Sequence, residues 1–394
     1  MTAPAAPDWI LECSGCGSHR GPAGLPSVCD ACGQPWLVRY PARRHGAVER
    51  AAAERGSDMW RFRSLLPLAP GEEPVSLGEG DTPLLAMPRT GVRFGLRSLL
   101  VKDESVNPTG SFKARGLSAA VTRATAAGAT GFVLPTAGNA GVAAAAYGAR
   151  AGRSVRVYAP RSTPRTILSQ IVSFGGELAL VDGHIGDCGR HAREYAAATG
   201  AVDLSTLREP YRIEGKKTLG LELALELGWT LPDAIVYPTG GGTGLIGMWK
   251  AFAELLEAGW VAGPMPKLFS VQAAGCAPVV RAFAAGAGHC QPWDDPRTEA
   301  SGLRVPAPLG GRLVLRALRE TGGAAVAVED GALLEAGRLA SREEGIDFSP
   351  EGGAAVAALG LLVGARLLRP EDRVVVFNTG AGWLYRDSGG LPLG

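Results

Sequence analysis

The sequence predicts an α/β protein with two open-sheet domains and a small metal-binding segment at its amino terminus. From about residue 77, short β-branched or Leu-rich runs alternate with Ala-rich segments, as in a mainly parallel sheet covered by helices. Several predicted strands end in small or polar residues, which is where open sheets bind ligands. Four cysteines form two Cys-x-x-Cys-Gly motifs before residue 34. These observations predict both the fold class and the places where chemistry is carried out.

Charge and composition exclude several classes of partner. The chain has 394 residues and a formal net charge of +2, from 40 Lys and Arg against 38 Asp and Glu. Such a balance gives no global field that would favour nucleic acid or an anionic membrane. The first eight residues lack the basic and apolar regions of a secretory signal, and no later run is apolar over the length of a bilayer. We therefore expect a cytoplasmic protein with no nucleic-acid or membrane partner.

The amino-terminal cysteines are Cys13, Cys16, Cys29 and Cys32, two pairs separated by twelve residues. This spacing suits tetrahedral thiolate coordination of zinc, with four protein ligands and hence a structural role. Iron in a rubredoxin-like site is an alternative, because spacing does not choose the metal. Two disulfides are a second alternative, which a reducing compartment disfavours. We interpret the remaining three cysteines as ordinary thiols.

The domain organisation follows from these changes of pattern. We predict a zinc ribbon at residues 1–40 and a connector at 41–75 that packs on the main body. A small α/β domain is predicted at 115–205, and a larger one from 76–114 together with 206–394.

The small domain shows the strand and helix alternation most clearly. Strands are predicted at 132–135, 155–158 and 178–181, and helices at 163–174 and 188–199. The first strand runs into Thr-Ala-Gly-Asn-Ala-Gly, where a helix begins. Asn139 is placed to donate to a phenolate-type oxygen. Backbone N–H groups of Thr136, Ala137 and Gly138 are candidates to hold a substrate carboxylate. The alternative is an ordinary helix-entry turn.

Lys113 ends the run Asn-Pro-Thr-Gly-Ser-Phe-Lys and stands where a predicted strand near residues 101–105 gives way to a helix. A lysine attacks a carbonyl only where burial or nearby positive charge lowers its pKa. We interpret Lys113 as an imine-forming amine. The alternative is a surface lysine on the first turn of a helix.

Two later strands also end in candidate ligand loops. The strand at 235–238 leads into a loop suited to a cofactor monophosphate, formed by Gly240, Gly241, Gly242, Thr243 and Gly244. The loop matches neither nucleotide-binding glycine motif, and a glycine turn without a ligand is the alternative. The strand at 374–377 leads to Thr379, whose neutral hydroxyl is placed to meet a heteroaromatic nitrogen. A further strand is predicted at 268–271. The helix dipole alone explains Glu351 in a first helical turn.

These four stretches, in this order, resemble the fold-type II pyridoxal-phosphate enzymes, which are similar to the tryptophan synthase β subunit. The zinc-ribbon prefix and Asn-Pro-Thr-Gly-Ser-Phe-Lys resemble the threonine synthase branch. The resemblance implies that Lys113 carries pyridoxal phosphate and that Asn139 contacts its phenolic oxygen. It further implies that the glycine loop holds the cofactor phosphate, that Thr379 meets the ring nitrogen, and that the enzyme is a homodimer.

By the same resemblance, the substrate is a small amino acid, phosphorylated or not, and the chain is a lyase. Threonine synthase eliminates phosphate from O-phosphohomoserine and adds water to give threonine. Members of that branch commonly have Asp after the lysine, where this chain has Ala114, and Ser-Thr-Gly-Asn-Thr-Ser at the asparagine loop. Buried donors discriminate between substrates. β-Elimination or β-replacement on serine, threonine, phosphoserine or a specialised amino acid is therefore the alternative. A non-catalytic protein that binds the cofactor or an amino acid is a third, disfavoured because all four stretches are retained.

Overall fold

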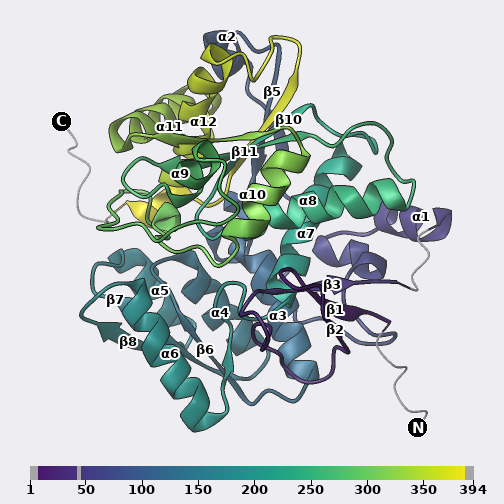
Figure 1. Ribbon diagram of the computed structural model, residues 1–394, viewed down its shortest axis with the longest axis vertical. Helices are drawn as coiled ribbons and strands as arrows, with labels where there is room; N and C mark the ends of the chain where they lie inside the picture. The colour runs from purple at the N-terminus through teal and green to yellow at the C-terminus, as the bar shows by residue number, and fades with distance from the viewer. Residues whose placement is uncertain (1–7, 42–45, 387–394) are drawn as a thin grey trace. The chain divides into compact units, whose positions relative to one another are not determined.

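The computed structural model describes residues 8–41 and 46–386 (Figure 1). The chain divides into two compact units. The first comprises the described residues of Met1–Asp81 together with Lys113–Leu219, and the second comprises Thr82–Phe112 together with the described residues of Gly220–Gly394. The domain boundaries given above stay a prediction. Parts of the predicted ribbon, connector and larger domain, at 1–7, 42–45 and 387–394, lie outside the described residues.

A three-stranded antiparallel sheet opens the first unit, in the order β2-β1-β3. Its strands are β1 (Ile10–Cys13), β2 (His19–Arg20) and β3 (Trp36–Arg39). A helix α1 (Ala47–Arg55) and a 3-10 helix η1 (Met59–Leu65) follow. The sheet packs on Tyr211 of the same unit through Trp9, Trp36 and Val38. The cysteine-bearing segment is thereby attached to a hydrophobic core.

The rest of the first unit is a four-stranded parallel sheet in the order β8-β7-β6-β9. The strands are β6 (Gly131–Pro135), β7 (Ser154–Pro160), β8 (Glu177–Val181) and β9 (Val202–Asp203). The helices are α3 (Lys113–Ala126), α4 (Asn139–Arg150), α5 (Arg165–Ser173), α6 (Ile185–Thr199) and α7 (Tyr211–Glu226), the last of which ends in the second unit. The predicted alternation of strands and helices is confirmed here, to within a few residues.

The second unit is built on a six-stranded sheet in the order β12-β11-β10-β13-β5-β4. Its strands are β4 (Leu84–Ala86), β5 (Ser98–Asp103), β10 (Ala234–Pro238), β11 (Lys267–Ala273), β12 (Ala324–Val328) and β13 (Arg373–Asn378). Only β4, at one edge, is antiparallel to its neighbour. This is the open, mainly parallel sheet that the sequence predicts.

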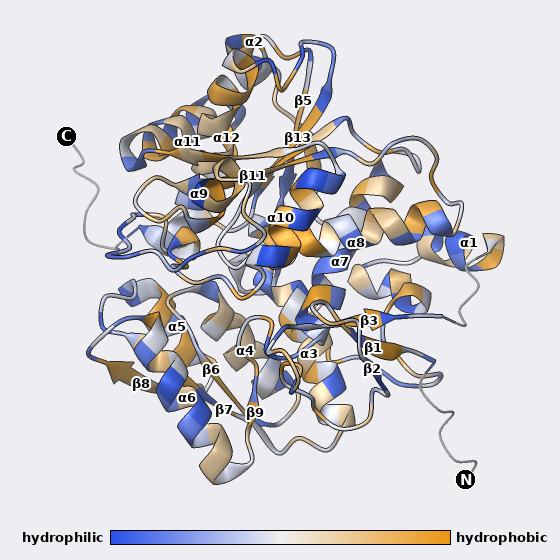
Figure 2. Cartoon of the chain, viewed as in Figure 1, coloured by the Kyte–Doolittle hydropathy of each residue, from blue (hydrophilic) through white to orange (hydrophobic). Residues whose placement is uncertain are grey.

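Helices complete the second unit. They are α2 (Pro88–Phe94), α8 (Thr243–Glu257), α9 (Pro278–Ala284), α10 (Gly311–Glu320), α11 (Asp330–Glu344) and α12 (Pro350–Gly364). The 3-10 helices are η2 (Glu104–Val106), η3 (Pro108–Gly110), η4 (Ser301–Leu303) and η5 (Gly382–Tyr385). In Figure 2, α10 is hydrophilic on one side and hydrophobic on the other. Leu313, Val314 and Leu318 of that helix are buried, so its apolar side packs inward.

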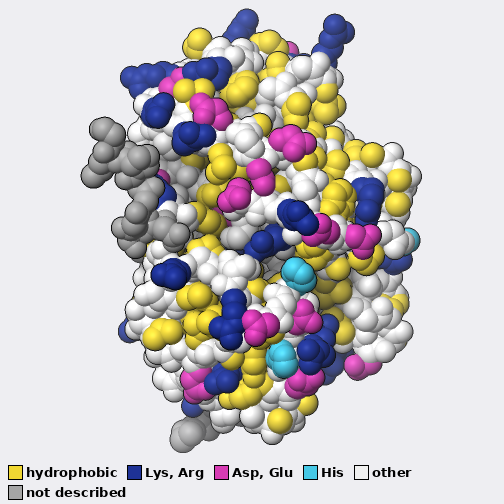
Figure 3. All heavy atoms as spheres, turned by 90° about the vertical axis from the view of Figure 1, so that its left-hand side faces the viewer, with side chains coloured by type: hydrophobic (Ala, Val, Ile, Leu, Met, Phe, Trp, Pro, Cys, Tyr) yellow, Lys and Arg dark blue, Asp and Glu magenta, His cyan; other side chains and the backbone are white. Residues whose placement is uncertain are grey.

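The outer surface carries both signs of charge. On the face drawn in Figure 3, basic and acidic side chains are interspersed among apolar and neutral ones. No helix of the described residues is long and apolar enough to cross a membrane.

Candidate active site

The segment before Lys113 is held by backbone hydrogen bonds to the residues after β13. The Phe112 N–H donates to the Thr379 carbonyl at 3.1 Å, and the Ala381 N–H donates to the Gly110 carbonyl at 2.9 Å. Lys113 follows Phe112 directly and is the first residue of α3, as predicted. The predicted cofactor lysine is therefore one residue along the chain from a hydrogen bond to Thr379.

The same segment is strained and has spare hydrogen-bonding capacity. Thr109, a β-branched residue, has a φ of +67°, in the left-handed region that favours glycine. The hydroxyl of Ser111 is fully buried and has no partner among the described residues. Strained backbone and unpaired buried polar groups are concentrated at functional sites. Both features are consistent with a ligand site beside Lys113.

The glycine loop offers a set of free donors at the start of a helix. Within the described part of the chain, the N–H groups of residues 240–244 meet no acceptor. Gly242, with a φ of +80°, is the N-cap of α8. Free N–H groups at the positive end of a helix form an anion site. The loop thus fits a cofactor phosphate, as the sequence predicts.

Neighbouring atoms pack so closely against two glycines of this loop that neither has room for a Cβ. A Cβ on Gly240 would lie 2.2 Å from the carbonyl oxygen of Gly302, and one on Gly244 would lie 1.9 Å from the Tyr237 hydroxyl oxygen. Glycine is therefore required at both positions for steric reasons.

Sequence reasoning missed the residue that holds Gly302 in place. The Gly302 N–H donates to Oε1 of Glu351 at 2.7 Å, and only 4% of Glu351 is exposed. The helix dipole alone does not account for so deeply buried a carboxylate. The contact joins residues 49 positions apart, and no motif in the sequence signals it.

Three neighbouring parallel strands bring the candidate parts of the second unit to one edge of its sheet. β13 lies between β10 and β5, with Val376 paired to Val236 on one side and to Val101 on the other. Since carboxyl ends of parallel strands meet at the same edge, the glycine loop, Thr379 and residues 104–112 lie together there.

The asparagine loop lies in the first unit, between β6 and α4. Asn139 is the first residue of α4 and is 8% exposed. The Thr136 hydroxyl donates to the Gly138 carbonyl at 2.7 Å and accepts from the N–H groups of Gly138 and Gly141. A Cβ on Gly141 would lie 2.4 Å from Cγ2 of Thr136. The loop is therefore closed by its own threonine, and position 141 has no room for a hydroxyl-bearing side chain.

A buried lysine of the first unit, Lys217, is neutralised by a neighbouring carboxylate. Nζ of Lys217 lies 2.8 Å from a carboxylate oxygen of Glu214 and 4.6 Å from the ring centre of Tyr40. The Tyr40 hydroxyl donates to the same carboxylate at 2.7 Å. All of these charges are balanced locally, so Lys217 contributes little free positive charge.

The four amino-terminal cysteines form one cluster. Their sulfur atoms all lie within 4.8 Å of one another, with Cys13 and Cys32 at 3.3 Å and Cys16 and Cys29 at 3.8 Å. Tetrahedral zinc with Zn–S bonds of about 2.3 Å requires sulfur atoms about 3.8 Å apart. All four are free thiols, so the disulfide alternative is not what the structure has. The donor set fits a zinc ion.

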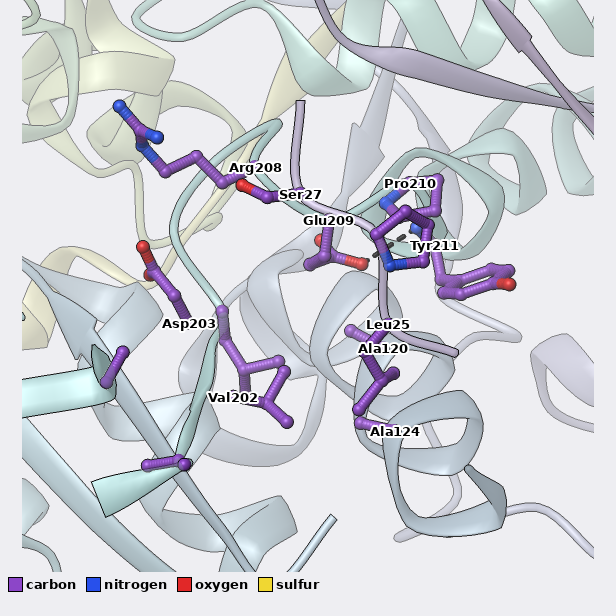
Figure 4. Close-up of a pocket in the computed structure, with 15 residues that line it drawn as sticks. Leu25, Ser27, Ala120, Ala124, Val202, Asp203, Arg208, Glu209, Pro210 and Tyr211 are labelled. Carbon is purple, nitrogen blue, oxygen red and sulfur yellow. Dashed lines mark hydrogen bonds between the residues drawn. The ribbon is translucent and has the colours of Figure 1, made fainter. Parts of the chain in front are cut away.

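A cavity of about 260 Å³ lies in the first unit beside the segment that links the cysteine pairs (Figure 4). Leu25 and Ser27 of that segment and Ala120 and Ala124 of α3 are among the residues that line it. Glu209 lies at its wall and accepts a hydrogen bond from the Tyr211 N–H at 2.7 Å, which is dashed in Figure 4. Burial raises the pKa of this carboxyl to about 7, against the opposing effects of Arg212 and the backbone N–H groups.

This shift predicts a pH-dependent stability. An unfolded Glu has a pKa of about 4.3, so between that value and about 7 the folded state holds more protons, and Glu209 destabilises increasingly as pH rises. Glu209→Gln stays neutral throughout. Its free energy of unfolding relative to the wild type is expected to rise by about 3 kcal/mol from pH 4.5 to 8. Urea unfolding across this range checks it, and a difference that is constant with pH contradicts it.

Comparison with known proteins identifies the family of this chain. The family model described as "Pyridoxal-phosphate dependent enzyme" matches residues 75–380. The threonine synthase of Methanosarcina acetivorans is 32% identical over 94% of this chain and 91% of its own, and that of Methanocaldococcus jannaschii is 31% identical over 95% and 92%. Maize serine racemase, at 22% identity, superposes with a TM-score of 0.67 over 78% of this chain and 89% of its own, which shows the shared fold.

The chain belongs to the pyridoxal-phosphate-dependent enzymes of fold type II, and among them it is a threonine synthase-like lyase. The predicted class of fold and class of enzyme are thereby confirmed.

Proposed function

We propose that this enzyme is a threonine synthase, which eliminates phosphate from O-phosphohomoserine and adds water at the β carbon to give threonine. The observation that carries the proposal is the edge shared by β10, β13 and β5, where a glycine loop, Thr379 and the segment leading to Lys113 end together. The similarity to threonine synthases over most of the chain supports the choice of reaction.

We assign the cofactor contacts as follows. Lys113 holds pyridoxal phosphate covalently, and the free N–H groups of residues 240–244 bind its phosphate. Asn139 donates to the phenolic oxygen. The hydroxyl of Thr379 meets the ring nitrogen and, being neutral, leaves that nitrogen without a full positive charge. Bound in this way, the cofactor supplies an electron sink for carbanions at the substrate.

The protein residues then direct the reaction. Of the three backbone N–H groups predicted to hold the substrate carboxylate, that of Thr136 donates to the Tyr158 carbonyl at 2.9 Å and that of Gly138 to the Thr136 hydroxyl at 3.1 Å. The Ala137 N–H therefore remains as the donor that would orient this carboxylate. With its amine free, Lys113 would move protons at the α and β carbons of the substrate as general base and acid. The limited charge on the ring nitrogen favours elimination and replacement over transamination.

A second candidate function is β-elimination or β-replacement on serine, threonine, phosphoserine or a specialised amino acid. The crowded position of Gly141 favours it, because a hydroxyl-bearing residue does not fit there. Buried donors of that kind discriminate strongly between substrates. We also propose zinc as the ion held by the four cysteines. The homodimer and the cytoplasmic location stay predictions.

A panel of amino acids scored by the spectral change of the cofactor tests this proposal. With O-phosphohomoserine, the enzyme is expected to release phosphate and form threonine in equal amounts, while Lys113→Ala releases neither. Production of a keto acid and ammonia from serine or threonine, with no phosphate release from phosphohomoserine, would instead establish the second function.

A further inference from the structure

A buried amide and a buried carboxylate face each other at the carboxyl ends of two paired strands. Asn378 on β13 is directly opposite Asp103 on β5 in the sheet register. Nδ2 of Asn378 donates to Oδ1 of Asp103 at 2.9 Å, and the two residues are 0% and 6% exposed. A hydrogen bond to a buried carboxylate is stronger than one between neutral groups, so this pair ties the strand ends firmly together.

The side-chain amide of Asn378 forms further hydrogen bonds. Nδ2 donates to the Asp347 carbonyl at 3.1 Å, and Oδ1 accepts from the Ser349 N–H, at the start of α12, at 3.1 Å. A Cβ on Gly352 would lie 2.4 Å from Oδ1, so the amide is also enclosed by the first turn of that helix. The side chain is therefore fixed on three sides, and an asparagine satisfies all of these contacts.

The residues that follow this pair along the chain are those assigned to the cofactor. Thr379 is the next residue after Asn378. After Asp103, the chain turns through Glu104 and Asn107, whose buried side chains share a hydrogen bond of 2.7 Å, and continues to Lys113. The pair therefore stands at the base of both segments, where it fixes their separation.

We propose that Asn378 and Asp103 are positioning residues, which hold the Thr379 hydroxyl at a set place relative to the segment that presents Lys113. The inference rests on the proposed roles of Lys113 and Thr379. Neither Asn378 nor Asp103 takes part in the chemistry. Their effect is transmitted through the backbone of the next residues, and displacements of about 1 Å at such sites reduce rates by about 100-fold.

A double-mutant cycle tests the pair through the cofactor rather than through activity alone. Asn378→Asp places two carboxylates against each other, whereas adding Asp103→Asn restores one donor and one acceptor in the opposite direction. Pyridoxal phosphate is titrated into each full-length protein, and its Kd and the absorption band of the lysine-bound cofactor are recorded together with the thermal midpoint.

Asn378→Asp is expected to weaken cofactor binding by about 10- to 100-fold and to shift the band, because a buried group is left unsatisfied. Asp103→Asn alone keeps an acceptor for Asn378 but loses the charge, so its loss should be smaller than that of Asn378→Asp. The double variant should recover part of the loss, because position 378 then still lacks a donor for the Asp347 carbonyl. An Asn378→Asp protein that melts earlier yet keeps the wild-type band and Kd would show a purely structural pair and overturn the inference.

The double variant keeps the test decisive even if Asn378→Asp does not fold. It restores the hydrogen bond between positions 103 and 378, so it must fold and bind cofactor more tightly than Asn378→Asp does. A double variant that performs no better than Asn378→Asp overturns the inference. Failure of the proposed function is seen separately, in the wild type. If Lys113→Ala keeps the absorption band of the wild-type protein, Lys113 does not carry the cofactor. The proposed function then fails, and this inference fails with it.

Discussion

Lys113→Ala is expected to abolish the covalently bound cofactor and to lower kcat/KM by at least about 10²- to 10⁴-fold. This range is what a positioned proton-transfer group alone contributes. The variant is expected to fold, because Lys113 is only half-buried, it begins a helix just after a backbone-bonded segment, and alanine favours helix. Absorption spectroscopy of the purified protein, before and after borohydride reduction, gives the measurement.

Lys267→Ala is the matched control for that experiment. Lys267 is the first residue of β11 and so lies at the opposite end of a parallel strand from the candidate site. Its replacement should leave the reducible band and the activity unchanged. A borohydride-fixed cofactor that remains in Lys113→Ala would show that another lysine is the attachment point.

Removal of the metal is expected to have the second largest effect. The structure predicts one equivalent of zinc per chain, bound by Cys13, Cys16, Cys29 and Cys32. Metal binding contributes about 10 to 16 kcal/mol to the folding of comparable zinc-finger peptides. Chelation should therefore unfold the three-stranded sheet that carries the cysteines, which hydrogen exchange of residues 8–41 would report.

Cysteine variants separate the metal site from general thiol effects. Cys16→Ser with Cys29→Ser should lose the metal, as determined by elemental analysis, while Cys188→Ser should keep it, because Cys188 is buried on α6 away from the cluster. Iron in place of zinc would be recognised by its visible absorption. Full metal content in the doubly substituted protein would contradict the assignment.

The sequence predicted those parts of the fold that local pattern determines. The strand at 374–377 is confirmed as β13 and the strand at 268–271 as β11, because β-branched runs between turn residues are local signals. Glu351 is confirmed in the first turn of a helix, α12, whose N-cap is Ser349. Candidate ligand loops were found in the same way, as small residues at strand ends.

Contacts between distant residues were beyond the reach of such reasoning. Lys102 is fully buried and forms ion pairs with Glu222 at 3.2 Å and Glu226 at 2.8 Å, yet in sequence it reads as one charge in a polar run. The bond from Gly302 to Glu351 and the pair of Asn378 with Asp103 have the same character. Each of these contacts depends on the order of the strands in the sheet, and a single sequence does not specify that order.

The order of strands also has a consequence for how this protein is made. β13 lies between β10 and β5, which are synthesised more than a hundred residues earlier. Until residue 378 emerges, β5 and β10 each lack the neighbour that covers one of their edges, and exposed edges promote aggregation. Nascent chains of this enzyme are therefore expected to depend on chaperones until β13 has been made, and a chain truncated before β13 is expected to gain no cofactor site.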